Sequence, residues 1–319
     1  MTSASRQSAL FEVEPLSPRT ERKQRARDRV EARIQIAHPQ AVPYELNRVY
    51  QVDCVEAMRR LPDASVDILI ADPPYNASKG NNWKWDNSVS LPGFGGKWSK
   101  VMADWDDMPL ADYFAFTIAW LQQVKRVVRP TGSIWIHGTY HNIGIINFAL
   151  QILSVEIINE VVWYKRNSFP NLSGRRLTAS HETILLAHTG GDKKRRYYFN
   201  YDASREMCSP EDLLKVEGKQ MRTVWDVPNN KKREELAFGK HPTQKPVRLL
   251  KRMLEISARP GDLLLVPFAG SGSDCVAAQE LGINFIGFET DPEFVRISND
   301  RVSNSNADAR LELDKCSEV

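Results

Sequence analysis

The residues of this sequence best suited to chemistry form the run DPPYN at positions 72–76, directly after an apolar stretch. Pro73 and Pro74 fix φ and lack backbone N–H groups, so the turn presents acceptors in a rigid frame. These acceptors are the Asp72 carboxylate and the Pro73 carbonyl. Together they could hold the hydrogens of an amino group, favour its pyramidal geometry and raise its nucleophilicity. Tyr75 could stack on the ring that carries this group.

A glycine turn after the apolar run LLLVPF is the second candidate. Gly270 and Gly272 would let the backbone approach a ligand where a side chain would clash. Glu289 follows about 20 residues later, at the end of the next apolar run, where a carboxylate can bind ribose hydroxyls. Structural glycines alone would form a similar turn, but the acid at this spacing favours a nucleoside site. The missing third glycine and the preceding Pro267-Phe268 favour S-adenosylmethionine over a dinucleotide.

Alternating strands and helices must position these two turns. The strands expected from apolar runs are 49–54, 66–74, 133–138, 156–165, 182–188, 263–268 and 284–289. The helices expected from apolar spacing are 55–61, 111–128, 142–153, 246–258 and 274–282. This order predicts an α/β fold with a mostly parallel sheet covered on both faces. In such sheets ligands bind beyond the carboxyl ends of the strands, where both turns are expected.

In these motifs the chain resembles the amino-methylating DNA methyltransferases of bacterial restriction–modification systems, in the permuted beta group whose catalytic motif precedes the cofactor motif. The resemblance covers about residues 49–298. It depends on ADPPYN at 71–76, HPTQKP at 241–246, PFAGSG at 267–272 and GFE at 287–289, in that order. It implies a three-layer Rossmann-like methyltransferase fold with a mostly parallel seven-stranded sheet and an inserted DNA-recognition region. It also implies S-adenosyl-L-methionine as cofactor.

The resemblance further implies roles for single residues. Asp72, Pro73, Pro74 and Tyr75 match the catalytic motif. The residues that match cofactor-binding segments are Asp53, Cys54, Thr243, Lys245, Phe268, Gly270, Ser271, Gly272 and Glu289. Among them, Asp53 would contact the adenine of the cofactor and Glu289 its ribose, while Thr243 and Lys245 would lie beside its methionine part.

The target implied by the resemblance is N6 of adenine in double-stranded DNA. The base must be flipped out of the duplex, because its amine cannot be reached inside it. Aspartate at the first motif position, Asp72, favours adenine over cytosine. The chain departs from the family pattern at Val266, where an acid usually precedes Pro-Phe. Asp274, placed where threonine is common, could compensate in binding the cofactor amine.

Three alternatives stay open. One is N4-cytosine methylation. Another is a catalytically silent DNA-binding relative, motivated by Val266. Methylation of a protein or RNA amide is disfavoured, because the motif of that group usually starts with asparagine.

Basic stretches between the two motifs are the favoured DNA surface. The stretch 165–176 combines phosphate-binding charge with asparagines and serines that can read base edges, and 193–196 is followed by two tyrosines. Each stretch alone would more often be a solvated face, but the family carries its target-recognition region here. The candidate DNA-binding residues are Lys165, Arg166, Asn167, Arg175, Arg176, Lys193, Lys194, Arg195 and Arg196.

The expected organisation has three parts. Residues 1–44 form a basic arm that either reaches DNA phosphates or makes a solvated helix. Residues 45–300 form the catalytic domain, with a loop insertion at 78–107 and a target-recognition region at about 166–240. Residues 301–319 form a C-terminal tail. The aromatic residues of the insertion either close over the flipped base or pack on the protein; they are Trp83, Trp85, Phe94 and Trp98.

Composition excludes several classes of protein. No apolar run reaches the roughly 18 residues of a membrane span, and the N-terminus does not resemble a signal peptide, so a cytoplasmic, nucleoid-associated location is expected. The four cysteines lack CxxC spacing, and His137, His141 and His181 lack metal-ligand spacing, so no metal or disulfide framework is expected. A net charge of +3 permits DNA binding. The expected partner is double-stranded DNA, with a homodimer and a cognate restriction endonuclease as further candidates.

Overall fold

The computed structural model describes residues 42–76, 108–168, 175, 177–190, 196–207, 212–229, 233–239 and 243–317. Almost all of the expected arm at 1–44 lies outside these ranges, as does the insertion at 78–107 with its four aromatic residues. Residues 42–44 at the end of the arm do belong to the folded part, because Val42 and Tyr44 pack on the core.

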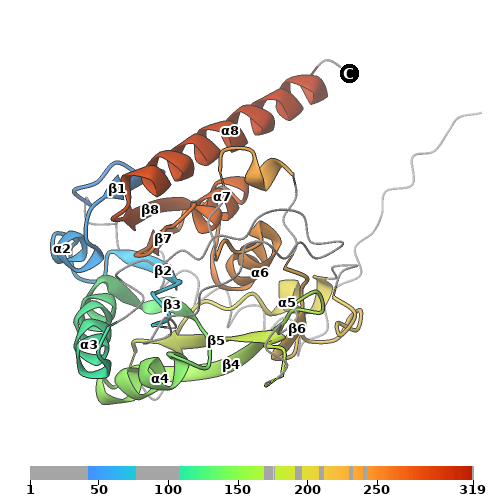
Figure 1. Cartoon of the computed structure of the whole chain (residues 1–319). Helices are drawn as coiled ribbons and strands as arrows, with labels where there is room; N and C mark the ends of the chain where they lie inside the picture. The colour runs from blue at the N-terminus through green and yellow to red at the C-terminus, as the bar shows by residue number, and fades with distance from the viewer. Residues whose placement is uncertain are drawn as a thin grey trace, which may run out of the picture. The chain divides into compact units, whose positions relative to one another are not determined.

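An eight-stranded sheet forms the centre of the fold (Figure 1). Its order is β1 (Arg48–Gln51), β8 (Asn284–Glu289), β7 (Leu263–Val266), β2 (Val66–Ala71), β3 (Val128–Gly138), β5 (His181–His188), β4 (Glu156–Tyr164) and β6 (Val224–Asp226). Only β5 pairs antiparallel with its neighbours in the sheet, β3 and β4. The predicted mostly parallel sheet is confirmed, with one strand more than the seven expected.

The additional strand, β6, lies inside the region expected to recognise DNA. Its three residues pair in parallel with β4, so that Trp225 lies opposite Trp163. A strand this short is below the length at which alternation can be recognised in a sequence. The same region contains a short helix, α5 (Tyr201–Glu206), and a 3-10 turn at Glu234–Leu236.

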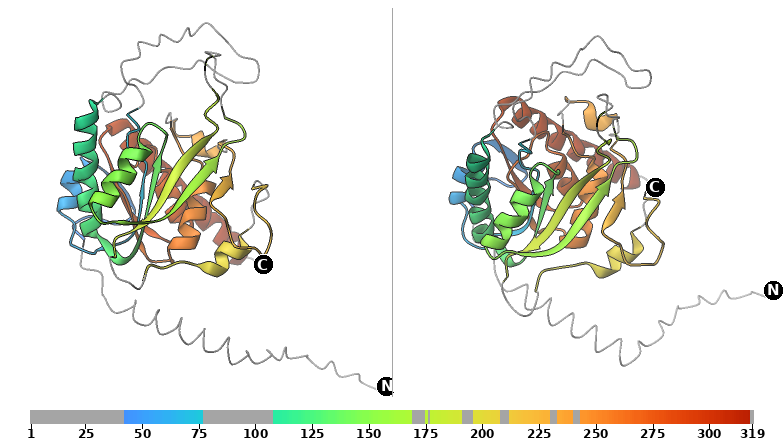
Figure 2. Two further views of the ribbon diagram at one scale, coloured as in Figure 1. Left: turned by 90° about the horizontal axis from the view of Figure 1, so that it is seen from below. Right: turned by 60° about the horizontal axis from the view of Figure 1, so that its bottom comes forward.

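Helices cover both faces of the sheet (Figure 2). One face is packed by α2 (Cys54–Arg59), α3 (Leu110–Val127) and α4 (Ile143–Ile152), whose buried side chains meet Leu69 and Ile134. The other is packed by α6 (Val247–Ser257), α7 (Ser273–Glu280) and α8 (Pro292–Ser317), which meet Ile68 and Trp135. Strands buried on both faces explain why their sequences are continuous apolar runs rather than alternating ones.

The last helix, α8, runs through the expected boundary between residues 300 and 301. Arg301 and Val302 are buried, and Arg301 donates hydrogen bonds to Ser271 in the glycine turn. The segment predicted as a C-terminal tail therefore begins inside a helix that packs on the domain. None of the helices in the described ranges has the length and apolar character of a membrane span.

Candidate active site

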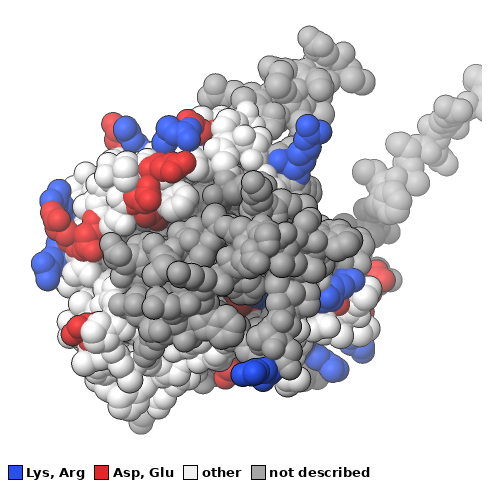
Figure 3. Space-filling view, in the orientation of Figure 1, with Lys and Arg blue, Asp and Glu red and all other residues white. Residues whose placement is uncertain are grey.

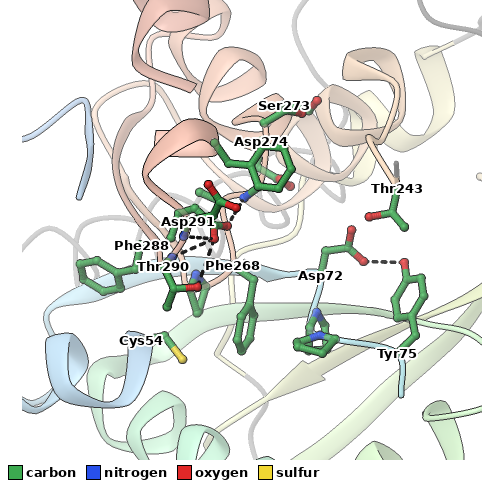
Figure 4. Close-up of a pocket in the computed structure, with 18 of the residues that line it drawn as sticks. Cys54, Asp72, Tyr75, Thr243, Phe268, Ser273, Asp274, Phe288, Thr290 and Asp291 are labelled. Atoms are coloured by element: carbon green, nitrogen blue, oxygen red, sulfur yellow. Dashed lines mark hydrogen bonds between the residues drawn. The ribbon is translucent and has the colours of Figure 1, made fainter. Parts of the chain in front are cut away.

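The two turns predicted to carry chemistry line one cleft of about 510 Å³ (Figure 4). This volume lies within the range of small-molecule sites, roughly 300–1,000 Å³. Neighbouring strands β2 and β7 run in the same direction, with Leu69 opposite Leu265, so both turns leave the sheet at one edge. The predicted catalytic and cofactor residues that line the cleft are Asp53, Cys54, Asp72, Pro73, Pro74, Tyr75, Thr243, Lys245, Phe268, Gly270, Ser271 and Glu289.

Gly272 is the predicted cofactor residue that does not line the cleft. It adopts a left-handed conformation with φ of 74°, directly before α7. A Cβ at this position would lie 2.8 Å from the Cβ of Ser298 in α8. The Ser298 hydroxyl donates a hydrogen bond of 2.7 Å to the carbonyl of Gly270. Gly272 therefore lets α8 pack behind the turn, and its predicted part in cofactor binding stays a prediction.

The Glu289 carboxylate is held in place by backbone N–H groups at the end of β8. Oε2 accepts a hydrogen bond of 2.8 Å from Gly270, and Oε1 accepts bonds of 2.8 and 3.0 Å from Thr290 and Asp291. A carboxylate offers about four acceptor positions, so three backbone bonds leave room for a hydroxyl group. The acid thereby ties the glycine turn to the next strand and still faces the cleft.

Asp72 is the centre of a polar network at the other part of the cleft. Its Oδ1 accepts a hydrogen bond of 2.5 Å from the Tyr75 hydroxyl, and its Oδ2 lies 2.6 Å from Nζ of Lys245. Lys245 also donates to the Tyr75 hydroxyl at 2.6 Å. The Lys245 side chain is only 4% exposed, and that of Asp72 is 16% exposed. Lys245, predicted to lie beside the cofactor, is thus a direct partner of the predicted catalytic acid.

Comparison with known proteins agrees with this geometry. The family model described as DNA methylase, of the N6/N4 type, matches residues 66–300. The type II methyltransferase M2.DpnII of Streptococcus pneumoniae is 38% identical over 267 residues, which cover 82% of this chain and 92% of that protein. M2.LlaDCHI of Lactococcus lactis subsp. cremoris is 36% identical over 253 residues, covering 79% and 87%. The chain belongs to the N6/N4 DNA methylase family.

This DNA methyltransferase also shares its fold with solved structures. The crystal structure of the M1.HpyAVI–SAM complex superposes with a TM-score of 0.55 at 24% identity, over 80% of this chain and 98% of that chain. At this identity the likeness shows the fold, which is that of class I methyltransferases dependent on S-adenosylmethionine. The resemblance identified from the sequence motifs is confirmed.

The cleft of the methyltransferase fits S-adenosylmethionine, the cofactor on which the family depends. Phe268, Phe288 and the buried residue Cys54 give the cleft an apolar part suited to an adenine ring. Burial raises the pKa of Cys54, so the thiol stays neutral. The Asp274 carboxylate is buried in the cleft, and its Oδ1 has no hydrogen-bond partner among the described residues. Such an orphaned acceptor is suited to a cationic group of a ligand.

Electrostatics keep the Asp72 network in one protonation state. Burial alone would lower the pKa of Lys245, but the carboxylates of Asp72 and Glu182 more than offset this, and the pKa lies above its usual value. Burial and the same two acids raise the pKa of Tyr75 well above its usual value. At neutral pH the network therefore contains an ammonium and a protonated phenol, both of which are hydrogen-bond donors.

Sequence reasoning missed one residue of this network, Glu182 at the start of β5, and a buried neighbour of the network, His137 on β3, whose ring nitrogens have no hydrogen-bond partner among the described residues. Oε1 of Glu182 lies 2.8 Å from Nζ of Lys165, and its Oε2 lies 3.6 Å from Nζ of Lys245. His137 is fully buried, and burial followed by the charge of Lys245 lowers its pKa to about 4. The signal for Glu182 was an acid opening a buried strand. This signal becomes informative only when β5 is known to be antiparallel. The start of β5 then lies at the same edge of the sheet as the ends of β2 and β7, where the cleft is.

The candidate DNA-binding residues fall into different environments. Lys165 is 13% exposed and pairs with Glu182, and the Asn167 side chain accepts a hydrogen bond from the backbone of Asn229. Arg166 is exposed and forms an ion pair with Asp226, and Arg175 and Arg196 are exposed. The remaining candidates, Arg176, Lys193, Lys194 and Arg195, lie outside the described residues. On the face drawn in Figure 3, basic and acidic side chains lie beside each other along the edges.

Proposed function

We propose that this DNA methyltransferase transfers a methyl group from S-adenosylmethionine to N6 of an adenine flipped out of double-stranded DNA. The observation that carries the proposal is the meeting of the Asp72-Pro73-Pro74-Tyr75 turn and the Gly270 turn on one cleft of about 510 Å³. The choice of adenine follows from the aspartate at the first motif position. The family includes N4-cytosine enzymes, so N4 of cytosine is the second candidate.

In the proposed mechanism the Asp72 carboxylate and the Pro73 carbonyl accept hydrogen bonds from the target amine and aim its lone pair into the cleft. S-adenosylmethionine supplies an electrophilic methyl group on a sulfonium when it is bound. Positive charge develops on the amine as it takes up the methyl group, and the negative charge of Asp72 stabilises it. S-adenosylhomocysteine would be the leaving group, and the methylated amine would release one proton to solvent. The Tyr75 ring lines the same part of the cleft and offers a face for the base. Positioning and electrostatics account for the rate, and no covalent enzyme intermediate is needed.

For the cofactor, we assign the adenine to the part of the cleft next to Asp53 and Phe288, and the ribose to Glu289. The family usually has an acid at position 266, where this chain has Val266. We assign the role of that acid, binding the cofactor ammonium, to Asp274. Val266 ends β7 and is fully buried, whereas Asp274 lines the cleft with an orphaned oxygen. The DNA partner would meet exposed basic residues of the target-recognition region. A homodimer and a cognate endonuclease stay predictions, and light scattering on the purified protein would test the first.

The product of the reaction tests this proposal. Purified protein is incubated with plasmid DNA and S-adenosylmethionine, the DNA is digested to nucleosides, and these are separated by mass spectrometry. N6-methyldeoxyadenosine is expected, N4-methyldeoxycytidine would establish the second candidate, and no modified base on varied duplexes would favour a silent DNA-binding protein.

The variant Asp72→Ala tests the role of the acid in the same assay. We expect its methylation rate to fall by at least about 100-fold, because the charge that stabilises the reacting amine is lost. Its affinity for S-adenosylhomocysteine, measured by calorimetry, should stay within about threefold, since Asp72 contacts the amine. Near-normal activity of this variant would contradict the assignment.

A further inference from the structure

Both carboxylate oxygens of Asp72 already have a cationic or hydroxyl partner in the structure. The Tyr75 hydroxyl donates to Oδ1, and the Lys245 ammonium lies 2.6 Å from Oδ2. An ammonium at this distance cancels much of the negative field of Asp72, because the network is almost fully buried and opposite charges interact strongly at low dielectric. It would also repel the positive charge that develops on the target amine. The arrangement suits a resting site better than a reacting one.

Glu182 provides a second acceptor for the same two donors. Its Oε2 lies 3.6 Å from Nζ of Lys245 and 3.4 Å from the hydroxyl of Tyr75. A displacement of Lys245 Nζ by about 1 Å would bring it within charge-assisted hydrogen-bond distance of Glu182. The flexible four-carbon stem of a lysine permits such a movement at little cost.

Lys165 holds Glu182 in position for this exchange. Its Nζ lies 2.8 Å from Oε1 of Glu182, so one oxygen is anchored and the other faces the catalytic turn. Burial alone would raise the pKa of Glu182, but Lys245 and Lys165 lower it to about 2, so the acid is ionised throughout the neutral range. Charges therefore alternate along a row in the order Lys165, Glu182, Lys245 and Asp72. His137, which is buried beside the row, stays neutral because its pKa is lowered.

We propose that Glu182 is a positioning residue that takes over the Lys245 ammonium when Asp72 accepts the target amine, and that Lys165 anchors Glu182 instead of contacting DNA phosphates. The exchange leaves Asp72 with its full negative charge at the moment when the amine becomes positive. The inference rests on the proposed role of Asp72 as the acceptor of the amine. Glu182 on β5 and Lys165 directly after β4 would thus act in catalysis, in addition to the role of these strands in the sheet.

Single-turnover methylation by Glu182→Gln tests this inference. The variant keeps the shape of the side chain but cannot attract the ammonium, so the rate from a preformed complex with DNA and S-adenosylmethionine should fall at least about tenfold. Affinities for DNA and S-adenosylhomocysteine should change by less than about twofold, whereas the melting temperature should fall, because the variant leaves the buried ammonium groups of Lys165 and Lys245 with less counter-charge. The matched control is Glu160→Gln, an exposed acid on the adjacent strand β4, which should react like the wild type. A Glu182→Gln rate within twofold of the wild type, or a loss of cofactor affinity as large as the loss of rate, would overturn the proposal.

A double-mutant cycle with Lys245→Met separates this role from a merely structural one. In Lys245→Met there is no ammonium for Glu182 to bind. Adding Glu182→Gln to this variant should therefore cause no further loss of methylation rate, or a partial recovery. A further tenfold loss would show that Glu182 acts independently of Lys245. The Asp72→Ala variant keeps the two proposals apart: if Asp72→Ala is inactive and Glu182→Gln is fully active, only the inference about Glu182 fails.

Discussion

At the scale of single residues, the buried acids in and beside the cleft differ because their surroundings differ. Asp72 lies beside one ammonium and Glu182 beside two, whereas Oδ1 of Asp274 has no hydrogen-bond partner among the described residues. Burial, followed by the charge of Asp72, raises the pKa of Asp274 to about 7. An acid with this pKa is half ionised near neutral pH, which makes its ionisation sensitive to a cationic ligand.

Asp274 predicts a pH-dependent affinity for the cofactor. Because its pKa is raised on folding, ionisation of Asp274 costs stability as the pH rises from about 4 through 7, and an ammonium bound beside it offsets this cost. Affinity for S-adenosylhomocysteine should therefore increase between pH 6 and pH 8 in the wild type, as measured by calorimetry. In Asp274→Asn the affinity should be lower at pH 8 and almost independent of pH.

Two comparisons make this prediction specific. Methylthioadenosine lacks the amino acid part of the cofactor, so Asp274→Asn should bind it like the wild type. Asp300→Asn, which changes an exposed acid of α8, should leave both ligands unaffected. Equal losses for the two ligands would instead indicate that Asp274 only supports the cleft.

At the scale of elements, the conformation of the glycine turn depends on α8, which packs on the side of the turn that faces away from the cleft. Gly272 combines a positive φ with close packing on α8, and either condition alone disfavours a side chain. The hydrogen bonds of Arg301 to Ser271 and Ser273 join the same helix to the turn. The geometry of the cofactor cleft thus depends on α8, of which Phe294 lines the cleft.

We expect Gly272→Ala to lower the free energy of unfolding by about 1–3 kcal/mol, because it adds a clash with Ser298 to a strained backbone. Urea denaturation followed by circular dichroism measures this change. Gly144→Ala in α4 is the control, since a Cβ there meets nothing within 4 Å, and it should stabilise the protein slightly through helix propensity. If both variants unfold at the wild-type urea concentration, α8 does not constrain the turn.

At the scale of the whole molecule, the DNA surface and the catalytic network share one region of the chain. Arg175 and Arg196 are exposed, whereas Lys165 is turned into the network around Glu182. The salt dependence of DNA binding increases with the number of contacts to phosphates. Substitutions of residues in the predicted basic surface should therefore change this dependence to different extents.

The double variant Arg175→Ala and Arg196→Ala should lower the slope of log K against log salt by about 0.9 for each lost phosphate contact, so by about 1.8 in all. Lys165→Met should leave this slope unchanged and lower the methylation rate instead. Fluorescence anisotropy on a labelled duplex at several salt concentrations gives the slopes. A lower slope in Lys165→Met would instead indicate that Lys165 contacts DNA phosphates.

The sequence by itself determined the strands and helices that carry the site, the two turns and the family, because these depend on local properties. Apolar runs define buried strands, prolines and glycines define turns, and the distance from Gly270 to Glu289 is set by one helix and one strand. Only the tertiary structure decided which side chains meet Asp72. Lys245 is 173 positions away in the sequence, and Glu182 lies near Tyr75 and Lys245 because β5 runs against its neighbours. Contacts of this kind arise from strand order and direction, and local patterns of residues do not encode either one.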